Sequence, residues 1–210
     1  MAGNGRANFC IAACAAFCGA AAVHGASYRH WTKRRTVKCA SRVLRACEDE
    51  CKASLGPLVS EGQREKVVAQ VDAAVADGAR LVLGGSSPEG AGWYYPATVL
   101  ADVSSEQRIS HDETFGPVVS LSVFDGSEEE AVRLANDTPY GLGANVFTGD
   151  GERGARVAAQ MHAGQVGINQ YLGGAPGTPW VGARQSGFGF LGGLEGHRQF
   201  TWPKSVSRPV

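Results

Sequence analysis

Several features that would assign this chain of 210 residues to a common protein class are absent from it. The longest apolar run, from Phe9 to Val23, has about fifteen residues, fewer than the ~20 that a membrane-spanning helix needs. The 20 basic and 20 acidic residues cancel, so the chain has no overall basic surplus of the kind that marks nucleic-acid-binding proteins. No cysteine follows Cys51, which excludes thiol chemistry from the larger part of the chain. We therefore expect no membrane span and no nucleic-acid partner.

The charges and cysteines that are present are unevenly distributed. Residues 1–54 hold nine Lys and Arg against three Asp and Glu, whereas the remainder holds eleven against seventeen. All six cysteines lie in the basic part. Such a difference indicates two segments with different histories. We expect residues 1–54 to be a diverged, irregular or targeting segment, because Arg6 followed by the apolar run is typical of a signal or transit peptide. The compartment stays open, since it depends on whether residues 1–23 are cleaved.

Cysteine spacing raises the question of a metal site. The first three cysteines are four residues apart, as are the last two, so a helix would bring each set to one face. A structural zinc site needs a further clear pair or histidines, and His24 and His30 are poorly placed by sequence. We expect no metal. The basic cluster at 33–35 is short enough to be an ordinary solvated charge run.

Beyond residue 55 the sequence alternates between helical and extended patterns. A capping box at Ser60 opens an amphipathic helix that Gly78 ends, and Ser127 and Asp150 are placed to begin two more. The third of these should reach about residue 162. Short buried or extended segments are expected at 81–83, 92–100, 118–124, 145–147 and 164–169. Alternation of this kind favours an α/β fold with a largely parallel sheet and flanking helices.

Five motifs occur in order along the second part of the chain. They are DETFGPV at 112–118, LANDTPYGLGA at 134–144, VFTGD at 146–150, AGQVGIN at 163–169 and PWVGARQSGFG at 179–189. Together they resemble the C-terminal half of the catalytic domain of NAD(P)-dependent aldehyde dehydrogenases. The resemblance implies a catalytic region at 55–204, a tail at 205–210, and a strand from Phe200 to Val206 that helps subunits to pair. The Rossmann-type cofactor domain that precedes this region in the family has no room here.

The resemblance also implies roles for individual residues. Glu113 would accept hydrogen bonds from the nicotinamide ribose of NAD or NADP, and Phe115 would pack beside the nicotinamide ring. Ser186 and Gly187 would shape the loop near the substrate channel, with Trp180 as a candidate lining residue and Tyr171 as another. The substrate would be a small-molecule aldehyde, oxidised to a carboxylic acid. One carboxylate and one ring cannot hold a dinucleotide alone, so most of the cofactor site must come from elsewhere.

The fifth motif, at 179–189, departs from the family pattern at two positions. Val181 stands where the family has one of a pair of glycines after the aromatic residue, and Arg184 stands where it has lysine. The string GFGFLG at 187–192 spells a dinucleotide-binding fingerprint, but no acidic residue follows at the spacing that the fingerprint requires. We therefore interpret it as part of the family's Ser-Gly-Phe-Gly turn.

The family oxidises aldehydes through a cysteine thiolate, a good nucleophile because its environment can lower the thiol pKa from about 8.5. Two cysteines fit the family's spacings. Cys10 lies forty-six residues before Gly56, and Cys14 lies nine residues before Val23. Neither follows the family's Gly-Gln pair, and no residue matches its activating glutamate. Two hypotheses stay open: an aldehyde dehydrogenase working as a homo-oligomer or with full-length relatives, or an inactive fragment that acts only as an oligomerisation or interaction module.

Overall fold

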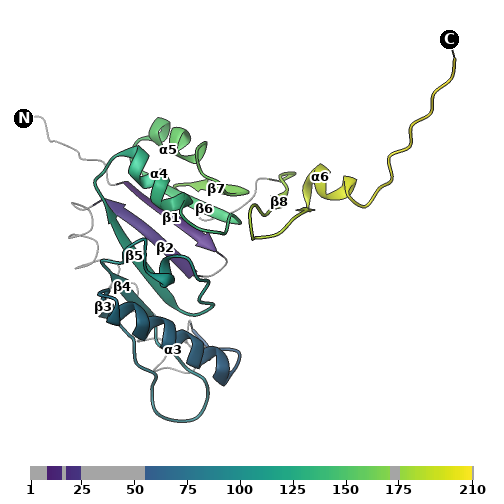
Figure 1. The fold of residues 1–210 in the computed structure, drawn as a ribbon. Coiled ribbons are helices and arrows are strands. Elements are labelled where there is room, and N and C mark those ends of the chain that lie inside the picture. Colours follow the sequence, from purple (N-terminus) through teal and green to yellow (C-terminus); the bar gives the residue numbers. More distant parts are fainter. Residues whose placement is uncertain (1–8, 16–17, 25–54, 171–175, 210) are drawn as a thin grey trace, which may run out of the picture.

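The computed structural model describes residues 9–15, 18–24, 55–170 and 176–209 (Figure 1). Its main sheet has seven strands in the order β3-β4-β5-β2-β1-β6-β7. The strands are β1 (Phe9–Ala15), β2 (Cys18–His24), β3 (Arg80–Leu83), β4 (Thr98–Ala101), β5 (Val118–Phe124), β6 (Gly143–Thr148) and β7 (Gln165–Ile168). The helices are α3 (Glu61–Ala76), the 3₁₀ turn η1 (Arg108–Ser110), α4 (Glu128–Asn136), α5 (Gly151–Ala158) and α6 (Gly193–Arg198).

The expected α/β class with flanking helices is confirmed, but the sheet is mixed rather than largely parallel. The pairs β2–β5, β4–β5 and β6–β7 are parallel, and the pairs β1–β2, β1–β6 and β3–β4 are antiparallel. Strand β1 ends at Ala15 and β2 begins at Cys18, a separation that only an antiparallel hairpin can bridge.

Two strands of the N-terminal segment thus lie in the middle of the sheet. They coincide with the apolar run for which a targeting role is one hypothesis. Because the backbone here is extended, the helical grouping of Cys10, Cys14 and Cys18 does not apply. Cys47, Cys51, His30 and the basic cluster at 33–35 lie outside the described residues, whereas His24 is the last residue of β2.

Helix α3 forms where its capping box predicts. The Ser60 hydroxyl accepts a hydrogen bond from the backbone N–H of Gln63 at 3.2 Å, and Gly78 follows the last turn with a φ of 100°. Val67, Val71 and Ala74 recur at helical spacing and are buried. They pack in one cluster that includes Leu100 and Val118 of the sheet.

Helices α4 and α5 begin at the residues expected to cap them. The Ser127 hydroxyl accepts from the N–H of Glu130, and Asp150 accepts from the N–H groups of Glu152 and Arg153. Helix α5 ends at Ala158, earlier than expected. After it the N–H groups of Gln160 and Met161 bond to carbonyls three residues back, as in a 3₁₀ turn, rather than four. In Figure 1 these helices lie beside β1, β6 and β7, while α3 lies at the β3–β4 end of the sheet.

Strand β3 differs from the buried strand that its sequence predicts. Arg80 and Leu81 are exposed, and Leu81 is 41% exposed, because β3 is at an edge of the sheet. Strand β4 is buried throughout and starts only after Pro96, in keeping with a bend at that proline. Strand β5 is the core strand expected from its apolar sequence.

The C-terminal residues form an arm that projects from the sheet (Figure 1). Its parts are a small hairpin of β8 (Trp180–Val181) and β9 (Phe190–Leu191), then α6, then an extended tail. The strand expected from Phe200 to Val206 is not formed in the single chain. A strand needs a hydrogen-bonded neighbour, and among the described residues this segment has none. Within the same described part, none of the helices has the length and apolar character needed to cross a bilayer.

Candidate active site

One edge of the sheet gathers the motif loops. Strands β2, β4, β5, β6 and β7 run in the same direction, and antiparallel β1 runs against them. The loop before β5, the turn before β6 and the end of β1 therefore meet at the edge where these parallel strands begin. We call this the site edge.

Helix α3 fixes the loop that carries Glu113 and Phe115. The side-chain amide of Gln63 donates to the carbonyl oxygens of Thr114 at 2.8 Å and of Phe115 at 3.1 Å. The ammonium of Lys66 donates to the Glu113 carbonyl at 3.4 Å. In the sequence, Gln63 is the residue that pairs with Ser60 in the capping-box pattern. In a complete capping box its side chain would bond back to the Ser60 backbone N–H. Here it reaches a loop 51 residues away instead.

The backbone of this loop has a conformation that exposes the Phe115 ring. Phe115 has a left-handed φ of 50° and is 53% exposed. At Gly116 an added Cβ would lie 2.7 Å from a Val67 methyl, so only glycine allows the loop to sit this close to α3. The result is a loop that is tethered to α3 and carries a half-exposed aromatic ring.

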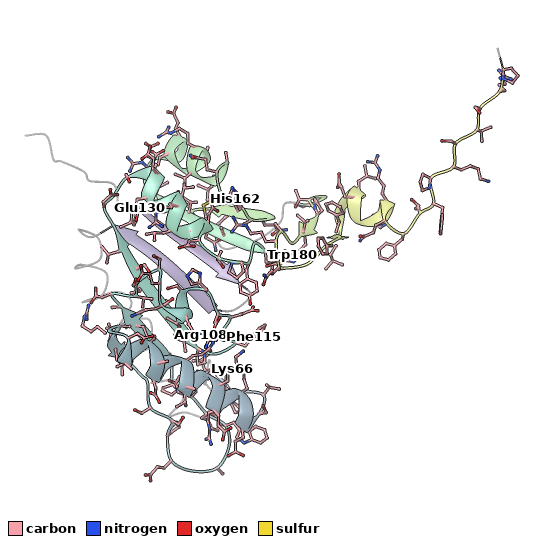
Figure 2. The ribbon with its side chains drawn as sticks, viewed as in Figure 1. Lys66, Arg108, Phe115, Glu130, His162 and Trp180 are labelled. Carbon is pink, nitrogen blue, oxygen red and sulfur yellow. The ribbon has the colours of Figure 1, made fainter. Side chains whose placement is uncertain are left out.

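Glu113 is partly buried beside this ring. Burial raises the pKa of its carboxyl, and the positive charge of Lys66 opposes that rise. Figure 2 shows Lys66 and Phe115 close together where α3 passes the loop. A carboxylate that is partly desolvated is a stronger hydrogen-bond acceptor for a ligand hydroxyl than one in open water. The arrangement thus combines an acceptor with an exposed flat ring.

A pocket opens on the other side of the same loop. It spans from Val118 and Ser120 of β5 to Gly143 and Ala144 of β6, with the end of α4 as a wall. Its polar lining includes Ser110, His111, Asp112, Thr114, Asn136 and Thr138. Asp112 and Thr114 line the pocket, while Glu113 and Phe115 are not among its described lining residues. Alternate residues of the loop therefore differ in their surroundings: Asp112 and Thr114 line the pocket, and Phe115 is exposed to solvent.

The two candidate nucleophiles occupy different places along β1. Cys14, the last residue but one of the strand, is in register with Gly143, a pocket residue. Cys10 is in register with Phe147 and lies four residues, or about 13 Å of extended chain, further from the site edge. The backbone topology therefore brings Cys14, and not Cys10, to the edge where the motif loops meet.

The loop at 179–189, which we call the channel loop, is docked on the turn before β6. The Ser186 hydroxyl accepts from the N–H of Gly141 at 3.0 Å, and the N–H of Ala183 donates to the Gly141 carbonyl at 3.0 Å. Gly187 follows with a φ of 104°, a conformation that glycine adopts readily. Ser186 and Gly187 are thus brought to the site edge.

Trp180 lies apart from the described pocket lining. It is 37% exposed and belongs to the hairpin at the base of the arm, as Figure 2 shows. Tyr171 lies outside the described residues. In the part of the chain that the structure describes, no group of three or more His, Cys, Asp or Glu side chains could hold a metal ion.

Arg184 is the centre of a hydrogen-bonded cluster that no sequence motif predicts. The guanidinium of Arg184 donates to the carbonyl oxygens of Asn136 and Thr138, each at 2.6 Å, and contacts Nδ1 of His162. The side-chain oxygen of Asn136 accepts a hydrogen bond from the backbone N–H of His162 at 2.8 Å. The only signal in the sequence is that arginine replaces the lysine of the resembled family.

Comparison with known proteins agrees with this geometry. The model of the "Aldehyde dehydrogenase family" matches residues 10–206. A betaine aldehyde dehydrogenase of Cereibacter sphaeroides is 43% identical over 152 residues, which cover 72% of this chain and 31% of that protein. The corresponding enzyme of Bacillus subtilis is 39% identical over 176 residues, covering 82% of this chain and 36% of that protein.

Solved structures give the same result. An aldehyde dehydrogenase from Bacillus cereus superposes with a TM-score of 0.80 at 34% identity, covering 88% of this chain and 37% of that one. A Mycobacterium tuberculosis aldehyde dehydrogenase complexed with NAD+ superposes with a TM-score of 0.71 at 42% identity, covering 75% of this chain and 33% of that one. The chain thus spans about a third of the length of the relatives it matches. It belongs to the aldehyde dehydrogenase family.

Proposed function

We propose that this chain takes part in the oxidation of an aldehyde to a carboxylic acid with NAD or NADP. The observation that carries the proposal is the convergence at the site edge of the Glu113 and Phe115 loop with the end of β1 that holds Cys14. The relatives are named as dehydrogenases, a likeness that does not favour a purely structural interaction module. Since several of them are named betaine aldehyde dehydrogenases, betaine aldehyde is the first substrate to test.

The outer side of the loop suits the nicotinamide end of the cofactor. Glu113 offers a partly desolvated acceptor for the ribose hydroxyls, and the exposed ring of Phe115 offers a flat face for the nicotinamide. A bound nicotinamide would supply the acceptor for the hydride. Charge-assisted hydrogen bonds contribute about 1.5–3 kcal/mol each, and association costs at least ~4 kcal/mol. The remaining dinucleotide contacts therefore come from outside this chain's described residues.

Between the two cysteines, the topology supports Cys14 as the nucleophile. Its thiolate would form a bond to the carbonyl carbon of the aldehyde, and the carbonyl oxygen would take up the negative charge. Once the hydride has left that carbon, water adds to the resulting thioester and the carbon–sulfur bond breaks. The products are a carboxylic acid and the free thiolate. Cys10 is the alternative, and its distance from the site edge argues against it.

The arm supports association with a second subunit. Phe200, Trp202 and Val206 are 83%, 96% and 86% exposed, and the segment that carries them is extended. Apolar side chains displayed in this way are typical of a surface that another chain covers. An extended segment can also add a strand to a sheet edge. We therefore infer that residues 200–206 dock on another copy of this chain or on a full-length relative.

The test of the activity is aldehyde-dependent formation of NADH or NADPH by the purified chain, alone and mixed with a full-length relative whose own cysteine has been replaced. Cys14→Ser should abolish the reaction and Cys10→Ser should leave most of it. Absence of reduced cofactor with betaine aldehyde and with simple aliphatic aldehydes, in both formats, would contradict the proposal.

A further inference from the structure

Arg184 occupies a backbone position that its residue type does not favour. It is the second residue of the turn Ala183–Ser186, which the Ser186 N–H closes by donating to the Ala183 carbonyl at 3.1 Å. Its φ is 54°, in the left-handed region. Glycine is the residue that such a turn position favours, because a side chain there costs free energy. An arginine that keeps this conformation needs compensating interactions.

The Arg184 guanidinium supplies them. It donates to the carbonyl oxygens of Asn136 and Thr138 at 2.6 Å each, and its other terminal nitrogen contacts Nδ1 of His162. These acceptors belong to two segments, the end of α4 with its following turn, and the connection between α5 and β7. Arg184 therefore ties the channel loop to both of them.

The acceptors are themselves held in place. The Asn136 side chain donates to the Gln160 carbonyl at 2.9 Å and accepts from the His162 N–H at 2.8 Å. Asn136, Thr138 and His162 also line the pocket at the site edge. A shift of the Arg184 side chain would thus be transmitted to the pocket wall.

Three further hydrogen bonds join the channel loop to the turn before β6. Across the interface the Gly141 N–H donates to the Ser186 hydroxyl, the Ala183 N–H to the Gly141 carbonyl, and the Gln185 N–H to the Pro139 carbonyl, each at 3.0 Å. These three amides are protected only while the channel loop lies on the turn. They give a direct measure of docking.

We propose that Arg184 is a positioning residue that locks the channel loop onto the 136–142 turn and so sets the aldehyde side of the site. The role rests on the proposed function where catalysis is concerned, but the docking stands on the geometry alone. Lysine cannot replace it, because a single ammonium lacks the planar set of donors that reaches three acceptors at once.

Hydrogen exchange of the three interface amides tests the proposal. In Arg184→Lys the charge is kept and the planar donors are lost. In Arg184→Gly the backbone strain is relieved and the side chain is lost. Both variants should speed exchange at Gly141, Ala183 and Gln185 about tenfold or more, the factor expected for loss of one charge-assisted hydrogen bond. Wild-type exchange in either variant would overturn the proposal.

A matched control separates docking from general loosening. Arg133→Lys removes a comparable two-nitrogen contact, that of Arg133 with Glu130 on the outer surface of α4, and should leave the three amides unchanged. Protection of the α3 amides shows whether each variant is folded. If Arg133→Lys also exposes the three amides, the effect is not specific to Arg184 and the proposal fails.

Kinetics then distinguishes this inference from the proposed function. Where the wild type turns over, the Arg184 variants should raise KM for the aldehyde about tenfold and leave KM for the cofactor within about twofold. An equal rise in both constants would contradict a role on the aldehyde side. If the wild type does not turn over at all, the proposed function fails, while the exchange result still decides the docking.

Discussion

At the scale of single residues, the ligand-binding role that we propose for Glu113 carries a cost in stability. Glu113 is a carboxylate that burial holds in an unfavourable environment, with Lys66 in partial compensation. A purely structural residue would not be expected to keep this arrangement, because an uncharged side chain would fit with less desolvation. The partly buried carboxylate is therefore consistent with a functional site.

Replacement of Glu113 by glutamine should have opposite effects on stability and on cofactor use. The folded-state pKa of Glu113 is raised, so its carboxyl favours folding below the ordinary glutamate pKa, and this advantage is lost as pH rises through the folded-state value. Glu113→Gln should thus raise Tm at pH 7, by a margin that shrinks on acidification, while it weakens cofactor use. Thermal unfolding at pH 7 and pH 4 and KM for NAD would measure the two effects. A lower Tm at pH 7 would show that the carboxylate is needed for the fold.

At the scale of elements, the helix starts were predictable and the strand neighbours were not. Ser60, Ser127 and Asp150 cap their helices through bonds to residues two or three positions away, so the sequence contains the whole interaction. Neighbours in a sheet are set by contacts far apart in sequence. The central place of β1, the exposed edge position of β3 and the absence of a strand at 200–206 all depend on which segments lie beside them.

The candidate site likewise has local features that the sequence predicts and long-range contacts that it does not. The motifs identify Glu113, Phe115 and Ser186, whose neighbours along the chain carry the pattern. The tether from Gln63 to the loop before β5 spans 51 residues and that from Arg184 to Asn136 spans 48, so no local pattern contains them.

The Gln63 tether leads to a prediction about α3. Gln63→Ala keeps the backbone N–H that Ser60 caps, but it removes both side-chain bonds to the loop before β5. We expect a loss of about 1–2 kcal/mol in the free energy of unfolding and a rise in KM for the cofactor. Chemical denaturation and steady-state kinetics would measure these. Gln160→Ala, which removes a single bond near the end of α5, is the control and should not change KM for the cofactor.

Helix α5 should lose stability on acidification. Hydrogen bonds from the Arg153 and Glu152 N–H groups hold the pKa of the Asp150 carboxyl below its ordinary value. Its contribution is therefore present above the unfolded-state pKa and is lost as pH falls through the folded-state value. Asp150→Asn keeps an acceptor without the charge, so its Tm should fall less than that of the wild type between pH 7 and pH 3. Parallel curves for the two proteins would exclude this role of the cap.

At the scale of the whole molecule, the arm is the feature that the single chain does not explain. The tail that follows α6 extends away from the sheet (Figure 1), and its side chains Phe200, Trp202 and Val206 are almost fully exposed. Deletion of residues 200–210 should lower the oligomeric state in analytical ultracentrifugation without unfolding the sheet. Trp202→Ser should have the same effect more weakly. If the deleted protein sediments with the same number of subunits as the wild type, the interface lies elsewhere.

Our central proposal is that the site edge is an active site in which Cys14 acts beside the Glu113 and Phe115 loop. The most direct measurement is peptide mass spectrometry after a short incubation of the chain with betaine aldehyde and NAD and a rapid acid quench that preserves thioesters. We predict an acyl group on Cys14, assigned by fragmentation of the peptide that also carries Cys10, and absent when NAD or the aldehyde is left out. An acyl group on Cys10 instead, or on no cysteine in a chain that reduces NAD, would contradict it.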